Sequence, residues 1–387
     1  MRLTIDTLQA NDGDCLLLHY ARSGSPTLRI LVDGGSRGIY REVLRPRIDQ
    51  LRHGGVLDLR MALVSHIDLD HITGILDLFR DMERVQDDGG EAFCRVRTLW
   101  HNAFEKVHAG RRAALQSAAV GAALGGAVPA GLNDKAAAVV ASVRQGAELR
   151  DAGERLGIVR NEGALEDLVR APEAGLRVIT VAPGLTLTVL GPRDEQLQEL
   201  DEEWRRSEQA HPADPEAQAA DYLNRTAPNL SSIVLLLEAA RPTGAPPVRV
   251  LLTGDAGGDH ILESLDKSGI GPGGRIHVDL LKVQHHGSSH STTQDFFERV
   301  TADRYVISGN GKHGIPHADA LAWLSAARRG QPYTVFLTNR KGQDGLEEML
   351  TAFLAREAAA EPAHRYLFRR EDRGFISTSF RSFPRRA

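Results

Sequence analysis

Runs of apolar and β-branched residues alternate with turn residues along the first part of the chain. Residues 2–9, 14–20 and 28–32 are short runs of this kind, separated by clusters of Asn, Asp, Gly, Ser and Pro. This is the pattern of β-strands joined by tight turns. Residues 40–52 and 72–82 instead place their apolar side chains three or four positions apart, as an amphipathic helix does. The opening of the chain therefore predicts a strand meander that continues into helices and strands.

The second half of the chain alternates strand patterns with helical patterns. Strands are predicted at 231–238, 248–253, 278–283, 305–308 and 334–338, and helices at 259–268, 293–300 and 318–327. The last two strand patterns, 365–369 and 374–380, flank Asp372-Arg373-Gly374 and predict a hairpin-like pair. This alternation favours a layered α/β sandwich whose functional loops leave the strand ends.

The middle of the chain differs from both ends. Residues 103–170 are rich in Ala, Arg and Glu, and residues 193–222 are strongly polar and acidic. Between them lies one predicted strand pair, 176–181 and 185–190. We interpret 103–170 and 193–222 as helical insertions in a single domain that spans 1–387. The insertions either decorate the surface or form a lid over a substrate site.

Composition and charge exclude several classes of protein. The 387 residues carry 47 basic and 51 acidic side chains, for a net charge of -4, so no global excess of positive charge indicates nucleic-acid binding. The two cysteines, Cys15 and Cys94, form no CxxC pair and indicate neither a disulfide framework nor a cysteine-rich zinc site. The N-terminus lacks the pattern of a secretory signal, and no apolar run approaches the roughly 18–20 residues of a membrane span. We expect a cytoplasmic protein with no membrane contact; the sequence leaves its oligomeric state open.

Potential metal ligands are concentrated in His66-Ile-Asp68-Leu-Asp70-His71, between a predicted strand at 61–65 and the helix at 72–82. On a tight loop, alternate side chains can converge on one metal ion and the adjacent pair on a second. A single histidine is more often a surface or core residue than a ligand, but here imidazoles and carboxylates recur at successive strand ends and loops. The further candidates are Asp33, Asp255, His285, His286, His313 and His317. The set predicts a metal site.

These motifs carry a family resemblance. The segment His66-x-Asp68-x-Asp70-His71 resembles the HxHxDH signature of the metallo-β-lactamase superfamily, with Asp68 in place of the second His. The segment Leu252-Thr-Gly-Asp255 resembles the bridging-aspartate motif of that superfamily. Together with Leu281-Lys-Val-x-His285-His286-Gly287-Ser288 and the later Ser308-x-Asn310 and Pro316-His317, the chain is similar to the hydrolase domain of the ComEC-type DNA-uptake proteins. The similarity runs from near residue 3 to about residue 327 and skips the two insertions.

The resemblance implies the metallo-β-lactamase αβ/βα sandwich and a metal site of two divalent ions. His66 and Asp68 would bind the first ion, Asp70 and His71 the second, and Asp255 would bridge them. His286 or its neighbour His285 would complete one shell, and we favour His286. This set has several carboxylates and fewer imidazoles, which shifts the preference from zinc toward manganese or magnesium without excluding zinc. The expected ions are zinc or manganese, with magnesium possible.

Further roles follow from the same resemblance. The ions would lower the pKa of a bridging water so that hydroxide forms near neutral pH, and Asp70 would orient that hydroxide. Lys282 could offset charge on a phosphoryl oxygen. His285, His290 or His317 could protonate the leaving group.

The chain departs from the family pattern at two positions. Asn229 stands where the superfamily often has a histidine ligand, and Ile315-Pro316-His317 replaces the usual His-Pro. The first departure would leave the first ion less tightly held. The second leaves the role of His317 open.

Three functions remain open from the sequence, since one fold supports many chemistries. The first is a phosphodiesterase or nuclease with nucleic acid as its substrate. The second is a hydrolase of a small phosphoester or cyclic nucleotide. The third, favoured least, is a non-catalytic binding module. β-Lactam hydrolysis is not favoured because two of the usual zinc-binding imidazoles are replaced.

Overall fold

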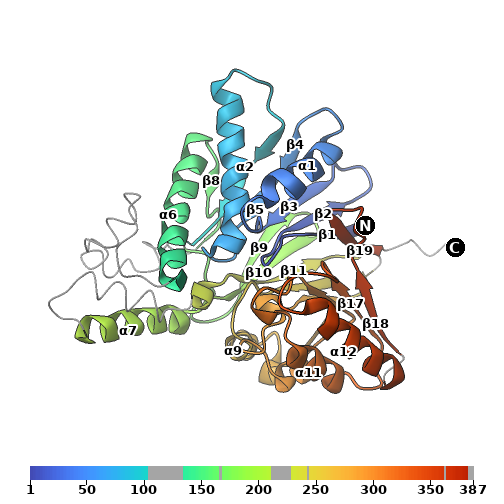
Figure 1. The fold of residues 1–387 in the computed structure, drawn as a ribbon. Helices are drawn as coiled ribbons and strands as arrows, with labels where there is room; N and C mark the ends of the chain where they lie inside the picture. The colour runs from blue at the N-terminus through green and yellow to red at the C-terminus, as the bar shows by residue number, and fades with distance from the viewer. Residues whose placement is uncertain (103–133, 165–167, 211–227, 242–243, 361–362, 382–387) are drawn as a thin grey trace.

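Two large β-sheets form the centre of the molecule (Figure 1). The computed structural model describes residues 1–102, 134–164, 168–210, 228–241, 244–360 and 363–381. The seven-stranded sheet has the order β19 (Phe375–Arg381), β1 (Arg2–Leu8), β2 (Leu16–Ala21), β3 (Leu28–Val32), β5 (Met61–Leu63), β7 (Thr98–Trp100) and β8 (Val159–Arg160). The eight-stranded sheet has the order β18 (His364–Phe368), β17 (Tyr333–Leu337), β16 (Arg304–Ile307), β14 (Leu280–Lys282), β12 (Val248–Leu252), β11 (Val234–Ala239), β10 (Leu185–Gly191) and β9 (Arg177–Ala182). Two short parallel pairs lie outside these sheets: β4 (Leu57–Leu59) with β6 (Cys94–Val96), and β13 (Ile276–Val278) with β15 (Val300–Ala302).

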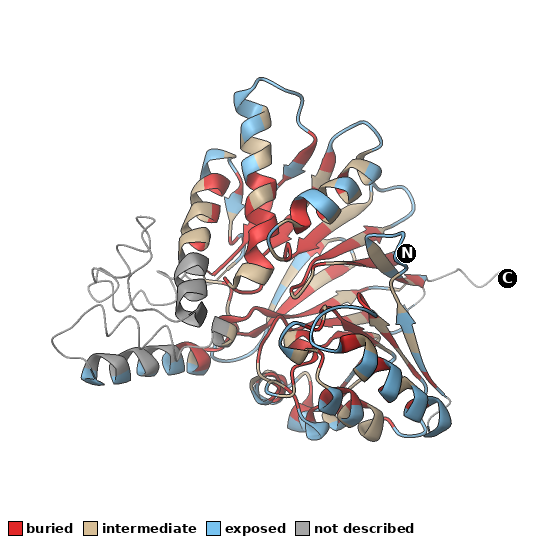
Figure 2. Cartoon of the chain, in the orientation of Figure 1, coloured by how far each residue is buried: buried red, intermediate tan, exposed pale blue. Residues whose placement is uncertain are grey.

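Helices cover the outer face of each sheet (Figure 1). On the seven-stranded sheet these are α1 (Arg45–Arg52), α2 (Leu69–Asp87) and α6 (Asp134–Arg155). On the eight-stranded sheet they are α9 (Gly258–Ser268), α10 (Gln294–Arg299), α11 (Ala318–Ala327) and α12 (Leu346–Ala360). Figure 2 shows these helices buried on the side that faces the sheets and exposed on the outside. The resulting order of helix, sheet, sheet and helix confirms the predicted α/β fold and is the αβ/βα arrangement expected of the metallo-β-lactamase fold.

Consecutive apolar residues of one strand pack into two different cores, one between the sheets and one under the helices. Side chains on a strand alternate between the two faces of its sheet, so Leu280 of β14 packs between the two sheets while Leu281 packs under the helices. On β3, Ile30 and Val32 enter the core between the sheets, and Leu31 enters the core under α1 and α2. Because both faces of these strands are buried, apolar residues occupy consecutive positions, Ile30-Leu31-Val32 in β3 and Leu280-Leu281 in β14.

The prediction of a closing hairpin is wrong. The two strands do form, as β18 and β19, but β18 pairs in parallel with β17, whereas β19 pairs antiparallel with β1. Each strand therefore completes the edge of a different sheet. β18 pairs with the preceding strand across the helix α12, whereas β19 pairs with the first strand of the chain. The turn between β18 and β19 indicates neither pairing.

The two predicted insertions lie partly outside the described residues. Residues 103–133 and 165–167 of the first insertion and 211–222 of the second are not described. The described part of the first contains α6, which packs against α2 and places Leu149 and Ala152 in the core under the seven-stranded sheet. The second contains α7 (Asp194–Ala210), a helix as predicted. Among the helices that the structure describes, none has the length and apolar character needed to cross a membrane.

Candidate metal centre

The predicted site residues follow the carboxyl ends of parallel strands in both sheets. β3 pairs in parallel with β5, and β12 pairs in parallel with β14. Asp33 follows β3 and His66 follows β5, while Asp255 follows β12 and His285 follows β14. In open α/β sheets, ligands bind outside the carboxyl ends of the strands. The fold therefore delivers side chains that are distant in the sequence to one place.

The segment from His66 to His71 crosses from a loop into the first turn of α2. Asp68 precedes the helix with extended backbone angles, and its side chain makes no capping hydrogen bond. Its Oδ2 atom lies 3.5 Å from His66 Nε2. Asp70 and His71 lie in the first turn of α2, with Asp70 Oδ2 3.7 Å from His71 Nε2. The short loop thus produces two His–Asp pairs, as the spacing predicts.

Glycines allow two loops to approach the start of α2. A Cβ on Gly34 would lie 2.3 Å from the backbone N of Ile75, and a Cβ on Gly13 would lie 1.7 Å from the backbone O of Asp70. The Gly34 N–H donates to the His71 carbonyl at 2.7 Å. No side chain fits at these contacts, so glycine is required there. This close approach brings Asp14 and Asp33, which follow and precede these glycines, beside His71.

Asp255 lies at the centre of the site. Its Oδ2 atom is 3.3 Å from His286 Nε2 and 3.7 Å from His285 Nε2. The same oxygen is 4.0 Å from His66 Nε2, and Oδ1 is 3.4 Å from His71 Nε2. We call His66, Asp68 and His285 the His66 group, and Asp70, His71 and His286 the His71 group. Asp255 lies between the two groups and contacts both.

Two adjacent histidines reach Asp255 because of an unusual backbone conformation. His285 and His286 both have positive φ, 47° and 54°, within the turn Gln284–Gly287 that follows β14. In an extended strand their side chains would point to opposite faces. Left-handed residues other than glycine cost roughly 1–2 kcal/mol each, and such strain is concentrated at functional sites. Both histidines therefore belong to the site, although the sequence favoured His286 as the ligand and gave His285 a role as the acid.

Hydrogen bonds on the far side of the imidazoles fix their orientation. His71 Nδ1 donates to Asp33 Oδ2 at 2.9 Å. His66 Nδ1 lies 3.1 Å from Ser65 Oγ, which itself donates to Asp33 Oδ2 at 2.8 Å. This network leaves the Nε2 atoms of both histidines free to act as ligands, which is how metal-binding imidazoles are usually held. Asp33 is therefore an orienting residue behind the site.

Asn229, which stands where the superfamily often has a histidine ligand, also contacts the far side of an imidazole. His285 Nδ1 lies 2.7 Å from Ser291 Oγ and 3.2 Å from the side-chain amide of Asn229. Asn229 thus contacts the back of an imidazole, on the side away from Asp255.

A buried ion pair, Asp14 with Lys282, underlies the site and was not predicted as a pair. Lys282 is 1% exposed and Asp14 is 1% exposed. The Lys282 ammonium contacts Asp14 Oδ2, donates to the Gly254 carbonyl at 3.2 Å and lies 3.8 Å from Asp255 Oδ1. The other oxygen of Asp14 accepts a hydrogen bond from Ser308. The sequence left open whether Lys282 acts on a substrate or has a structural role, and in the structure its ammonium contacts protein oxygens.

Burial and charge compete in setting the pKa values of the site. Burial alone would lower the pKa of His71, but Asp255, Asp70 and Asp33 outweigh it and raise that pKa well above its ordinary value. Burial would raise the pKa of Asp255, yet His286 and His71 hold it well below its usual range. The pKa of His285 is lowered, because burial dominates there. Without a cation, protonated imidazoles balance the carboxylates, and a metal ion would replace those protons.

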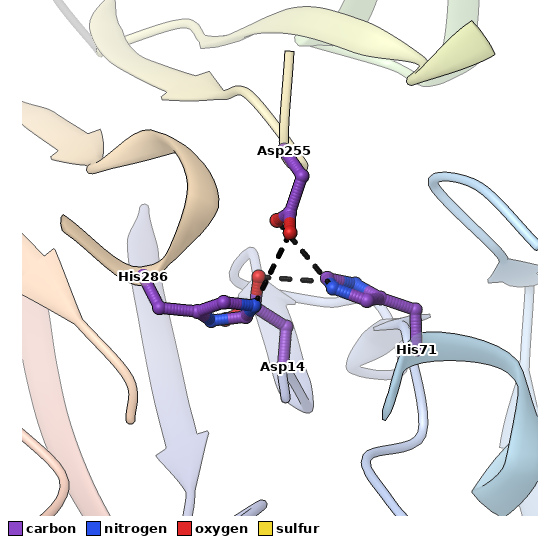
Figure 3. Close-up of side chains that lie close together, drawn as sticks. All are labelled: Asp14, His71, Asp255 and His286. Carbon is purple, nitrogen blue, oxygen red and sulfur yellow. Dashed lines mark ion pairs between the residues drawn. The ribbon is translucent and has the colours of Figure 1, made fainter. Parts of the chain in front are cut away.

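The residues fit a metal ion. His66 Nε2, His71 Nε2, His286 Nε2 and Asp255 Oδ1 are buried with no hydrogen-bond partner, which is rare for polar atoms unless an ion or water binds them. Asp14, His71, Asp255 and His286 offer ligand atoms that all lie within 4.8 Å of one another (Figure 3). In this set Asp14 faces the Nδ1 atoms of the two histidines, while Asp255 faces their Nε2 atoms. The Nε2 side is therefore the side on which an ion would bind.

His317, expected near the reaction, lies in a different set of contacts. Its Nδ1 atom accepts from the Ser289 backbone N–H at 2.9 Å, and its ring lies edge-on to His290 with centroids 5.6 Å apart. Within the described part of the chain, no ion pair joins His317 to Asp255 or to the carboxylates beside it.

A cavity of about 150 Å³ opens onto the site. It is lined by the site residues Asp70, His285 and His286 together with Asn310, Lys312 and His313. Since one water needs roughly 10–15 Å³ of such volume, the cavity holds several waters. The cavity is therefore large enough for a phosphoryl group and a small substituent.

Comparisons with known proteins identify no family for the chain. No protein-family model matches it, and no curated protein matches it. Three solved protein chains match, among them the metallo-beta-lactamase fold protein YhfI from Bacillus subtilis. That chain is 10% identical, with 98% of this chain and 100% of the other covered, and the TM-score is 0.37. The fold and the candidate site are therefore defined by this chain's own sheets, helices and side chains.

Proposed function

We propose that the protein is a metal-dependent phosphodiesterase whose substrate is nucleic acid. One observation carries this proposal: Asp255 lies between two groups that each contribute two imidazoles and one carboxylate. Such an arrangement suits a pair of divalent ions that share one carboxylate, as in many enzymes that cleave phosphate esters.

The ligand assignment follows the contacts of the Nε2 atoms. The His66 group with Asp255 would hold one ion, and the His71 group with Asp255 the other. When bound, the ions make hydroxide available near neutral pH and offset negative charge on the phosphoryl oxygens. Because both His285 and His286 belong to the site, four imidazoles accompany three carboxylates. This revises the expectation of fewer imidazoles and favours zinc or manganese over magnesium.

The chain's own residues would position the reacting groups. Asp70 lines the cavity and lies 3.5 Å from His286 Nε2, so its carboxylate can orient the attacking water. Lys282 holds Asp255 and Asp14 in place from beneath. Lys312, on the cavity wall, supplies a positive charge next to an anionic substrate while paired with Asp12.

The substrate class rests on the resemblance to the hydrolase domain of ComEC-type proteins, and the charge of the surface adds little. Two pairs of adjacent arginines, Arg328-Arg329 and Arg369-Arg370, could bind phosphate groups. However, Arg328 is buried, 5% exposed, and Arg370 is paired with Asp372. A second candidate is a hydrolase of small phosphodiesters, because a cavity of about 150 Å³ accommodates a small substituent as readily as one nucleotide linkage.

An activity assay distinguishes these candidates. Protein stripped with a chelator should be inactive, and manganese or zinc should restore cleavage of DNA, RNA or bis(p-nitrophenyl) phosphate. The double variant Asp70→Ala, His71→Ala should abolish that activity. A matched control removes the exposed His277–Asp303 pair, whose atoms lie 3.4 Å apart, by His277→Ala, Asp303→Ala, and should retain activity.

Each result has a separate meaning. Activity on the small diester alone refutes the nucleic-acid substrate and favours the second candidate. Equal activity in the wild type and the Asp70, His71 variant refutes the metal site.

A further inference from the structure

His313 is the free titratable side chain of the cavity beside the metal centre. The other titratable residues that line the cavity all have charged partners among the described residues: Asp12 with Lys312, Asp70 with His71 and His286, and His285 with Asp255. His313 lines the same cavity, is exposed, and has no hydrogen bond or ion pair with any described residue. Its imidazole is therefore available to a molecule in the cavity.

The loop that carries His313 is held firmly in place. The Gly311 N–H donates to the Ile315 carbonyl at 3.1 Å, and the Gly314 N–H donates to the Gly311 carbonyl at 2.8 Å. The Gln343 N–H also donates to the Asn310 carbonyl at 2.7 Å. A Cβ on Gly311 would lie 2.2 Å from the Gln343 carbonyl oxygen. The loop is thus packed against the segment before α12, which fixes the position of the His313 backbone.

His313 itself has a strained backbone. Its φ is 58° and its ψ is 23°, which is the left-handed region that residues other than glycine rarely adopt. The hydrogen bonds of Gly311 and Gly314 hold the backbone in this conformation. His313 is exposed and lines the cavity.

The other histidines near the site have different roles. His285 and His286 direct their Nε2 atoms at Asp255. His290 and His317 pack against each other, and His317 Nδ1 is occupied by Ser289. Neither His290 nor His317 lines this cavity in the described part of the chain. Among these histidines, His313 is therefore the one whose imidazole can contact a leaving group in the cavity.

We propose that His313 is a catalytic residue that donates a proton to the leaving oxygen of the phosphodiester, a role that rests on the proposed function. Water oxygen forms the new bond to phosphorus while the bond from phosphorus to the leaving oxygen breaks. The electron pair of that bond stays on the leaving oxygen, which takes the proton from the His313 ring. The proton lost by the attacking water passes to solvent, and His313 regains a proton from solvent before the next turnover.

The test compares two phosphodiesters that differ in their need for an acid. The leaving p-nitrophenolate of bis(p-nitrophenyl) phosphate is stable without a proton, whereas the alkoxide leaving group of dithymidine monophosphate is not. The variant is His313→Asn, because asparagine tolerates left-handed backbone angles and cannot act as an acid. General acid catalysis contributes about 10²–10⁴-fold. We therefore expect a loss of this size on dithymidine monophosphate and a change within about threefold on the aryl ester.

The chain offers a matched control. His53 is also exposed and left-handed, with φ 48°; it ends α1 and is not one of the residues that line the cavity. His53→Asn should leave both rates unchanged. His313→Asn should also bind as many metal ions per chain as the wild type. Equal metal content shows that its lower cleavage rate does not arise from a damaged metal site.

The outcomes separate the two proposals. Equal losses on both substrates, or no loss on either, overturn the assignment of His313 and leave the phosphodiesterase intact. If the wild type cleaves only the aryl ester, it has no working general acid, and the assignment of His313 is overturned as well. A metal-loaded wild type that cleaves neither ester overturns the proposed function, and the assignment of His313 with it.

Discussion

Replacing Lys282 with methionine removes a buried ammonium while retaining a side chain of similar length. The ammonium contacts Asp14 and lies 3.8 Å from Asp255 Oδ1. At an effective dielectric constant of about 20, two unit charges at such a distance interact by about 4 kcal/mol. Breaking a buried pair by removing one partner costs about 3–5 kcal/mol, because the remaining charge is left uncompensated. We expect the metal-free variant to lose that amount of unfolding free energy.

The loss should depend on metal. For a chain of 387 residues, 3–5 kcal/mol corresponds to a fall in Tm of roughly 4–6 °C. Bound cations would compensate Asp255 in place of the ammonium, so manganese or zinc should stabilise the variant more than the wild type. Adding Asp14→Asn should recover part of the loss, since both partners of the pair are then neutral.

The assay is denaturant unfolding of each variant with chelator and with metal. Lys267→Met is the control, because Lys267 is a surface lysine of α9 paired with Glu195 and Glu263, and it should leave the unfolding midpoint unchanged in both conditions. If Lys282→Met is as stable as the wild type without metal, or if metal stabilises both proteins equally, Lys282 does not neutralise Asp255 and this reasoning is wrong.

Three further predictions concern residues around the site and in the fold. Gly34→Ala should cost about 3 kcal/mol or more of unfolding free energy and weaken metal binding, because its Cβ would lie 2.3 Å from the Ile75 N. Gly55→Ala should change neither, because its nearest neighbour, the Arg52 carbonyl oxygen, would lie 3.4 Å from the new Cβ. Asp33→Asn should weaken metal affinity about 10–100-fold by titration calorimetry, since Asp33 orients His71; unchanged affinity would refute that role. Burial would raise the pKa of Asp6, but hydrogen bonds from His19 and Ser377 and the charge of Arg47 lower it, so its contribution to stability is present above the unfolded pKa of about 3.9 and is lost as pH falls through the lower folded value. Asp6→Asn should therefore be less stable than the wild type at pH 7, with a difference that narrows at pH 3; a gap that does not change with pH would contradict this.

Local sequence was sufficient to predict most of the elements. The meander of β1, β2 and β3, the helix α2 and the parallel strands β12, β14 and β16 all form where their patterns indicate. Strand partners that are distant in the sequence were not predictable in this way. β18 and β19 follow one another with only a short turn between them, which is a hairpin pattern, yet each pairs with a strand of a different sheet. Their partners are chosen by burial against the completed sheets.

The candidate site also has parts that the local sequence predicts and parts that it does not. The carboxylates and imidazoles that the sequence singled out at His66–His71, Asp255 and His285–His286 are brought together by the fold. Asp14 was missed as a site residue because Asn11-Asp12-Gly13-Asp14 is also a common turn sequence. Its role depends on Lys282, 268 positions later, and a pairing of this kind leaves no local signal. Lys282 itself was a candidate from the sequence; because a charged residue inside a buried strand requires a partner, its position indicated that a carboxylate would lie beside it, but not which one.

Metal content of the purified protein tests the central claim most directly. After metal loading and dialysis, the wild type should retain two divalent ions per chain by elemental analysis. Asp68→Asn, which alters the His66 group alone, should retain one tightly held ion, and Asp255→Asn should lose tight binding of both. A wild type that holds no ion, or an Asp255→Asn variant that holds as many as the wild type, would contradict a metal centre organised around Asp255.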